Sequence, residues 1–168
     1  MIYNFDRAAA IPAADDVFCC LGTTIAKAGS RDAFRKVDFE YIVGLARNAR
    51  KAGAKRFLVV SSLGANAHSA VFYSRVKGET EQALQAIGFR ELHLFQPSLL
   101  LGNRHESRMG ERIGIAATTF ITPLMLGPMR KYRPIEAQAV ARAMWKTAWA
   151  NRRGNHVYPS EKIVVLAD

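Results

Sequence analysis

The stretch that decides the fold begins Arg56-Phe-Leu-Val-Val-Ser-Ser62 and runs on to Leu84. Its apolar, β-branched part, residues 57–60, predicts a buried strand that stops at the two serines. A loop rich in Gly, Ala, Asn and Ser follows, and a helical pattern starts near Phe72. The sequence therefore predicts a strand, a loop and a helix in succession.

Three side chains of this unit are candidates for chemistry. Ser62 follows the strand, while Tyr73 and Lys77 stand one helical turn apart on one face of the predicted helix. In an open α/β sheet ligands bind at the carboxyl ends of the strands, so we expect these side chains to converge on one crevice. Ser61 competes with Ser62, because neighbouring residues of a strand point to opposite sides.

A serine at the end of a strand, followed by Tyr-x-x-x-Lys, resembles the catalytic set of the short-chain dehydrogenase/reductase superfamily. Three sequence segments are similar to those of one atypical branch of this superfamily, the Tat-interacting-protein-like (oxidoreductase HTATIP2-like) family. The similarity extends over nearly the whole chain. The three segments are Val17-Phe-Cys-Cys-Leu-Gly-Thr-Thr24, Val71-Phe-Tyr-Ser-Arg-Val-Lys-Gly-Glu79 and Gln96-Pro-Ser-Leu-Leu-Leu-Gly102. The resemblance implies binding of NADP or NAD, with NADP slightly preferred.

The chemistry implied by the resemblance is hydride transfer between a nicotinamide and a small carbonyl or alcohol. Tyr73 would give and take the proton; a phenol has a reference pKa of about 10, and an ammonium one turn away favours the phenolate. Lys77 would supply that ammonium, and Ser62 would hold the substrate oxygen. The implied cofactor-binding residues are Leu21, Gly22, Thr23, Tyr73, Lys77, Pro97, Ser98 and Leu99.

The predicted fold class is α/β, a doubly wound, Rossmann-like parallel sheet in a single domain of residues 1–168. Such a sheet normally opens with a strand, a glycine-rich turn and a helix that together hold the pyrophosphate. No G-x-G-x-x-G or G-x-x-G-x-x-G occurs in the sequence. Compared with the family, the chain is expected to lack its first βαβ portion, as a truncated or mis-started product, which would leave an apolar edge on the strand at residues 17–21.

Further elements are predicted from hydrophobic periodicity. Gly53 ends a helix over residues 38–51, and a long helix over residues 134–149 turns Ala141 and Trp145 inward. The remaining predictions are strands at residues 2–5, 92–95 and 156–158, a helix over residues 113–122, and either a helix or a strand over residues 160–167.

Charge and cysteine usage limit the other classes. The formal charge is +10 with a pI near 10.1, yet the basic residues are scattered and do not alternate with aromatic residues, so no nucleic-acid partner is expected. Cys19 and Cys20 lie in one apolar run and predict buried thiols without a disulfide, and the dispersed histidines predict no metal site. Prolines and glycines interrupt residues 113–129, so no membrane span is predicted, and without a signal-peptide pattern the cytoplasm is the expected location.

Two functions of different classes follow from the sequence. The first is an NAD(P)-dependent oxidoreductase with a small-molecule substrate. The alternative is a catalytically impaired regulatory or protein-interaction module that keeps the fold without turnover, which the missing glycine-rich loop favours. The sequence leaves the substrate and the oligomeric state open, a homo-oligomer included.

Overall fold

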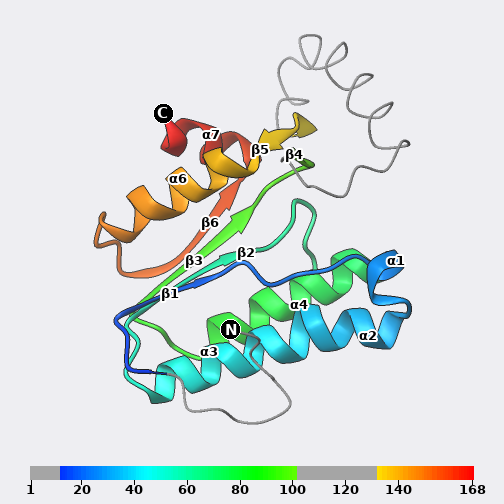
Figure 1. The fold of residues 1–168 in the computed structure, drawn as a ribbon, viewed down its shortest axis with the longest axis horizontal. Coiled ribbons are helices and arrows are strands. Elements are labelled where there is room, and N and C mark those ends of the chain that lie inside the picture. Colours follow the sequence, from blue (N-terminus) through cyan, green and yellow to red (C-terminus); the bar gives the residue numbers. More distant parts are fainter. Residues whose placement is uncertain (1–11, 102–131) are drawn as a thin grey trace.

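The fold is a parallel sheet covered by helices on both faces, as seen in a computed structural model that describes residues 12–101 and 132–168 (Figure 1). The sheet has the order β1-β2-β3-β6, and a second parallel pair joins β4 to β5. This arrangement confirms the predicted α/β class. The strands are β1 Asp16–Cys19, β2 Arg56–Val60, β3 Glu91–Gln96, β4 Leu100–Leu101, β5 Ile135–Glu136 and β6 Gly154–Pro159.

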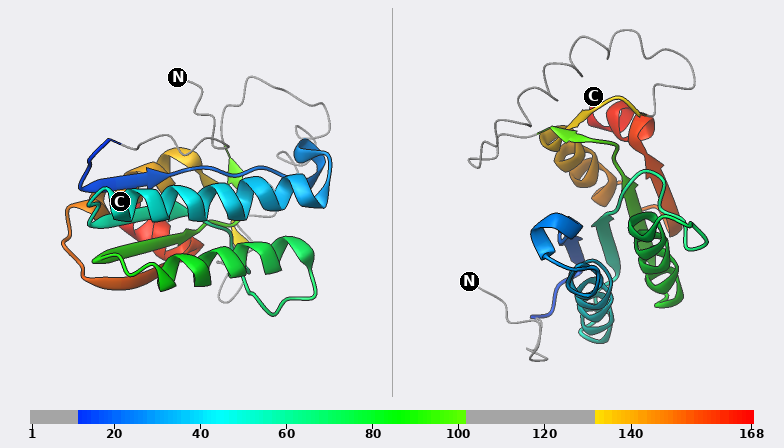
Figure 2. Two further views of the ribbon diagram at one scale, coloured as in Figure 1. Left: turned by 90° about the horizontal axis from the view of Figure 1, so that it is seen from below. Right: turned by 90° about the vertical axis from the view of Figure 1, so that its right-hand side faces the viewer.

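The helices divide between the two faces of the sheet (Figures 1 and 2). On one face lie α1 Ile25–Ala28, α2 Arg31–Arg35, η1 Lys36–Tyr41, α3 Ile42–Lys51 and α4 Phe72–Ala86; on the other lie α6 Ala137–Ala148 and α7 Ser160–Ala167. Figure 2 shows α3 and α4 side by side beneath the strands. A parallel sheet covered on both faces explains why its strands are continuous apolar runs.

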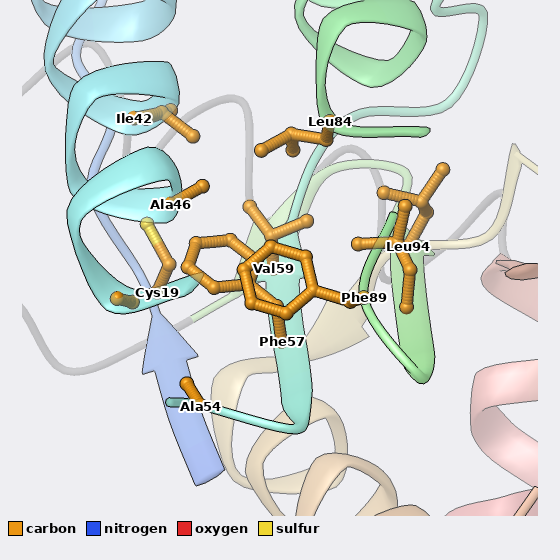
Figure 3. Close-up of a cluster of buried hydrophobic side chains, with 11 residues drawn as sticks. Cys19, Ile42, Ala46, Ala54, Phe57, Val59, Leu84, Phe89 and Leu94 are labelled. Atoms are coloured by element: carbon orange, nitrogen blue, oxygen red, sulfur yellow. The ribbon is translucent and has the colours of Figure 1, made fainter. Parts of the chain in front are cut away.

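Strand β2 shows how one strand serves two cores. Phe57 and Val59 face α3 and α4, where they join a cluster with Ile42 and Leu84 (Figure 3). Leu58 points the opposite way and packs in the cluster formed with α6 and α7. Because all three side chains are buried, β2 holds the centre of the sheet and fixes the position of the serines that follow it.

Three crossover connections join the parallel strands β1 to β2, β2 to β3 and β3 to β6, and they do not all have the same handedness. The strand order advances in one direction from β1 to β6, with α3 and α4 on one face and α6 on the other. The crossover through α6 therefore has the opposite hand to the two before it. Since parallel crossovers in proteins nearly always follow a single hand, this is an unusual feature of the sheet.

The helix predicted to begin at Asp38 in fact begins at Arg31, where Ser30 caps it by accepting a hydrogen bond from the Ala33 backbone. It continues without a break to Lys51, and η1 is a π-helix within it. Asp38 is fully buried in this segment, so it is a core residue and not a helix start. A π-turn holds about one residue more than an α-turn and marks functional sites in many proteins.

Two residues of α6 that the sequence predicted to face the core are exposed in the structure, so these two predictions were wrong. Trp145 is 60% exposed and Ala141 is exposed, because the buried stripe of α6 runs through Val140, Ala143 and Met144 instead. Cys19 is buried as predicted, whereas Cys20 is exposed because it lies beyond the end of β1.

The remaining predictions have mixed outcomes. The helix predicted to open at residue 134 begins at Ala137, and α7 settles the ambiguity at residues 160–167 as a helix. The elements predicted at residues 2–5 and 113–122 lie outside the described residues. Within the described ranges, no helix combines the length and apolar character needed to cross a lipid bilayer.

Candidate functional site

A buried ion pair lies at the carboxyl end of β1. The Lys77 ammonium, on a side chain 6% exposed, is 2.6 Å from Oδ1 of the fully buried Asp38. The other carboxylate oxygen of Asp38 accepts a hydrogen bond from the backbone N–H of Thr23 at 2.9 Å. The structure thus joins Lys77 to the Gly22-Thr23 turn, two parts of the predicted cofactor site, through a third residue.

Gly22 leaves backbone exposed beside this pair. A Cβ atom on Gly22 would lie 3.4 Å from Oδ1 of Asp38 and 3.7 Å from Nζ of Lys77, which is ordinary contact distance. Leu21, by contrast, is partly buried and packs against the core cluster of α3 and α4. Of the predicted turn residues, Gly22 is therefore the one that presents an open surface next to the charges.

Asp38 was missed by the sequence reasoning, although the sequence contains a signal for it. Its spacing of four residues before Ile42 places it on the buried, apolar face of the helix. A carboxylate on such a face requires a cation or several donors, because an isolated buried charge is costly. The hydroxyl of Thr80 also donates to the Asp38 carbonyl at 2.8 Å and ties this segment to α4.

The two serines after β2 have different environments. Ser61 donates to Oε1 of Glu81 at 2.5 Å, on the side of the strand that faces α4. Within residues 12–101 and 132–168, the hydroxyl of Ser62 bonds only the Leu63 carbonyl, at 3.4 Å. Ser61 is thus engaged in a structural contact, and Ser62 is the serine whose hydroxyl is weakly held.

The loop after Ser62 lies against the start of α4. The Asn66 N–H donates to the carbonyl of Ser74 at 3.0 Å. At Gly78 an added Cβ would lie 2.1 Å from the backbone nitrogen of Ala67, so only glycine permits this approach. The loop that carries Ser62 is therefore anchored to the helix that carries Tyr73 and Lys77.

Tyr73 lies in the first turn of α4, half-buried, with its ring 5.4 Å from that of Phe34. No hydrogen bond among the described residues joins its hydroxyl to Ser62 or Lys77. The structure places all three residues at the carboxyl edge of the sheet, but the direct partner of Lys77 is Asp38.

Residues 97–99 lie beside the Ser62 loop. The buried Pro97 accepts a hydrogen bond from the Leu63 N–H at 2.9 Å. The Ser98 hydroxyl donates to the Arg133 carbonyl and lies 3.1 Å from the Ser160 hydroxyl. Leu99 is exposed, so it is the member of this predicted set that offers a free apolar side chain.

A cavity of about 420 Å³ adjoins this edge on the α6 face. Cys20, Val60 and Leu100 line it; Cys20 precedes Leu21, Leu100 follows Leu99, and Val60 lies two residues before Ser62. A larger hollow of about 590 Å³ lies along β6 and α7. Neither lining includes Ser62, Tyr73 or Lys77, so the larger hollow is separate from the candidate chemistry.

Sequence comparison finds relatives but no matching family model. The chain is 46% identical over 94 residues to Protein HTATIP2 of Rattus norvegicus, covering 56% of this chain and 38% of HTATIP2. It is 34% identical over 149 residues to Protein fmp52-1, mitochondrial, of Aspergillus terreus, covering 89% of this chain and 64% of the relative. A third relative, Protein FMP52-1, mitochondrial, of Scheffersomyces stipitis, is 41% identical over 91 residues, which are 54% of this chain and 40% of the relative. The chain spans less than two thirds of the length of each of these relatives.

Solved structures share the fold at low sequence identity. MoeE5 in complex with UDP-glucose and NAD superposes with a TM-score of 0.64 at 14% identity, covering 98% of this chain and 64% of MoeE5. RMD from Pseudomonas aeruginosa complexed with NADPH superposes with a TM-score of 0.66 at 16% identity, covering 94% and 65%.

The chain therefore has the Rossmann-like α/β fold that MoeE5 and RMD share. In sequence, the chain is similar to the HTATIP2 and FMP52 proteins. Several fungal relatives carry the word mitochondrial in their names, so a cytoplasmic location for this chain stays a prediction.

Proposed function

We propose that the chain is an NAD(P)-dependent oxidoreductase that transfers hydride between a nicotinamide and a small carbonyl or alcohol, in a single cytoplasmic domain. The observation that carries the proposal is the position of Lys77, buried under the exposed Gly22 backbone at the carboxyl end of β1. Ligands of open α/β sheets bind at this edge. The NAD and NADPH present in the MoeE5 and RMD structures support the cofactor class, and NADP is our preferred choice.

The residues present suit the nicotinamide ribose end of such a cofactor. Lys77 offers ammonium donors, Asp38 offers carboxylate oxygens, and the exposed Gly22 lets a ribose come close to both. The sequence contains no glycine-rich loop for the pyrophosphate. We propose that the cofactor binds through these three residues, with Leu99 as apolar surface against the ring.

The nicotinamide, when bound, supplies or accepts the hydride. In reduction of a carbonyl, Tyr73 donates the proton to the oxygen and Ser62 holds that oxygen by a hydrogen bond. In oxidation of an alcohol, the same tyrosine takes the proton back. The ion pair with Asp38 shares the charge of Lys77, so we assign Lys77 primarily to orienting the ribose.

The test is a titration of the purified chain with NADPH and NADH, followed by nicotinamide fluorescence, with 9,10-phenanthrenequinone as a carbonyl probe for turnover. Tyr73→Phe should lower turnover at least about 100-fold and leave cofactor affinity unchanged. Tyr132→Phe, at an exposed tyrosine, is the matched control. Equal turnover of the two variants would remove Tyr73 from its role.

The second candidate is a regulatory or protein-interaction module that keeps the fold without turnover. If neither nucleotide binds at millimolar concentration, this candidate replaces the enzyme.

A further inference from the structure

Glu81 is a buried carboxylate that the proposed chemistry does not use. It lies on α4 and is 8% exposed. One of its oxygens accepts the Ser61 hydroxyl at 2.5 Å, and both accept the side-chain amide of Gln96 at 3.0 Å. A single carboxylate thus joins the carboxyl ends of β2 and β3 to the helix that bears Tyr73.

These contacts surround Ser62. The Ser61 N–H donates to the Phe95 carbonyl at 2.6 Å, and the Leu63 N–H donates to Pro97 at 2.9 Å. The backbone is therefore fixed on both sides of Ser62. The one side chain that holds this segment from the direction of α4 is Ser61, through Glu81.

The hydrogen-bond geometry of Glu81 agrees with an accepting role. Burial raises the pKa of Glu81, while hydrogen bonds from Ser61 and Gln96 and the charge of Lys77 oppose that rise. Ser61 and Gln96 both act as donors here, and a carboxylate accepts from both. A side chain with only one acceptor oxygen cannot replace all three contacts.

We infer that Glu81 is a positioning residue: by holding Ser61 and Gln96, it directs the Ser62 hydroxyl toward the substrate oxygen. The inference rests on the proposed oxidoreductase function. It also explains why the adjacent serines have different roles: Ser61 holds the backbone through its hydrogen bond to Glu81, and Ser62 contacts the substrate.

Glu81→Gln tests the inference, because its NH2 group faces the NH2 group of Gln96 and one contact is lost. Turnover of 9,10-phenanthrenequinone with NADPH should fall about tenfold in kcat, with the KM for NADPH within about twofold of the unmodified chain. Ser61→Ala should give a similar loss. The double variant should be no more than about twofold slower than the slower single variant, since both changes disrupt the same set of hydrogen bonds around the Glu81 carboxylate.

Glu79→Gln is the matched control, because Glu79 lies two residues away on α4 and pairs with Arg35 instead. All variants are compared at a temperature where circular dichroism shows them folded. If the unmodified chain oxidises no NADPH, the proposed function fails and takes the role of Glu81 with it. If the unmodified chain is active and Glu81→Gln matches Glu79→Gln, or if the two losses multiply in the double variant, the inference about Glu81 alone is overturned.

Discussion

The Nζ atom of Lys77 lies 2.6 Å from Oδ1 of Asp38, and both side chains are withdrawn from solvent. The same carboxylate accepts a hydrogen bond from the Thr23 backbone, so one side chain links the turn after β1, the long helix and α4. Removing one partner of such a pair leaves an uncompensated buried charge, whereas removing both partners leaves none.

Asp38→Asn should therefore lower the free energy of unfolding by about 3 kcal/mol, because the Lys77 ammonium loses its counter-ion. Urea unfolding at pH 7 measures the change. Glu40→Gln is the control, since Glu40 is an exposed carboxylate in the same π-helix and should change stability by less than about 0.5 kcal/mol. Asp38→Asn combined with Lys77→Met should recover part of the loss; a double variant less stable than Asp38→Asn would contradict the pairing.

Gly78→Ala should displace the loop after Ser62, because the new methyl group would overlap the backbone of Ala67. We expect a loss of stability and of NADPH-dependent turnover together. Gly44→Ala is the matched change: Gly44 is also helical, nothing lies within 4 Å of its added Cβ, and alanine should stabilise α3 by roughly 0.5–1 kcal/mol. Equal unfolding midpoints for the two variants would show that the loop does not lie where the structure places it.

The buried His93 predicts acid sensitivity. Burial lowers the pKa of His93 to about 4, aided by the charge of His156 and opposed by Glu91. The unfolded chain, with an ordinary histidine pKa of about 6.5, then binds more protons than the folded chain between those values. Stability should be complete above about pH 6.5 and should fall as the pH drops toward 4, by up to roughly 3 kcal/mol from this group.

Urea unfolding across that pH range checks the effect. His93→Leu should flatten the dependence, while the exposed His68→Leu should leave it unchanged. An identical pH dependence in both variants would assign the acid sensitivity to other groups.

Tryptophan fluorescence can test which face of α6 is exposed to solvent. Trp145 and Trp149 are 60% and 70% exposed, and the chain contains no other tryptophan. Iodide should therefore quench most of the fluorescence of the folded chain, nearly as well as it quenches the fluorescence of the chain unfolded in urea. Trp149→Phe isolates Trp145, and protection of the remaining emission would mean that the inward orientation predicted from sequence holds after all.

The strands and the central strand-loop-helix unit were predictable because buried parallel strands are short apolar runs that end at serine or glycine. Residues 57–60 and 92–95 each fall inside an observed strand. Trp145 was misjudged because hydrophobicity alone assigns a large aromatic residue to the core, while the register of α6 buries its neighbour Met144 instead. The hydrophobic pattern still fits a helix whose buried face is shifted by one residue, whereas the packing of that helix fixes which residues are buried.

Local spacing predicted that Tyr73 and Lys77 share one helix, but it did not predict the partner of Lys77. Spacing along one helix placed Tyr73 and Lys77 together, but the ion pair of Lys77 crosses 39 residues of sequence to Asp38. The contact of Ser61 with Glu81 crosses 20 residues. Both are long-range contacts between elements, which local patterns do not encode.

The π-helix has a consequence for tolerance to sequence-length changes. Its wide turn in effect accommodates one additional residue, so deleting a single amino acid between Lys36 and Tyr41 could be absorbed by reverting to an ordinary α-helical turn. The helix on either side would keep its rotation, because the residue removed is the extra one, and the change would be confined to the wide turn itself. Asp38 lies in that turn, so a chain shortened there would keep its helix and lose the contact between Asp38 and the Thr23 amide.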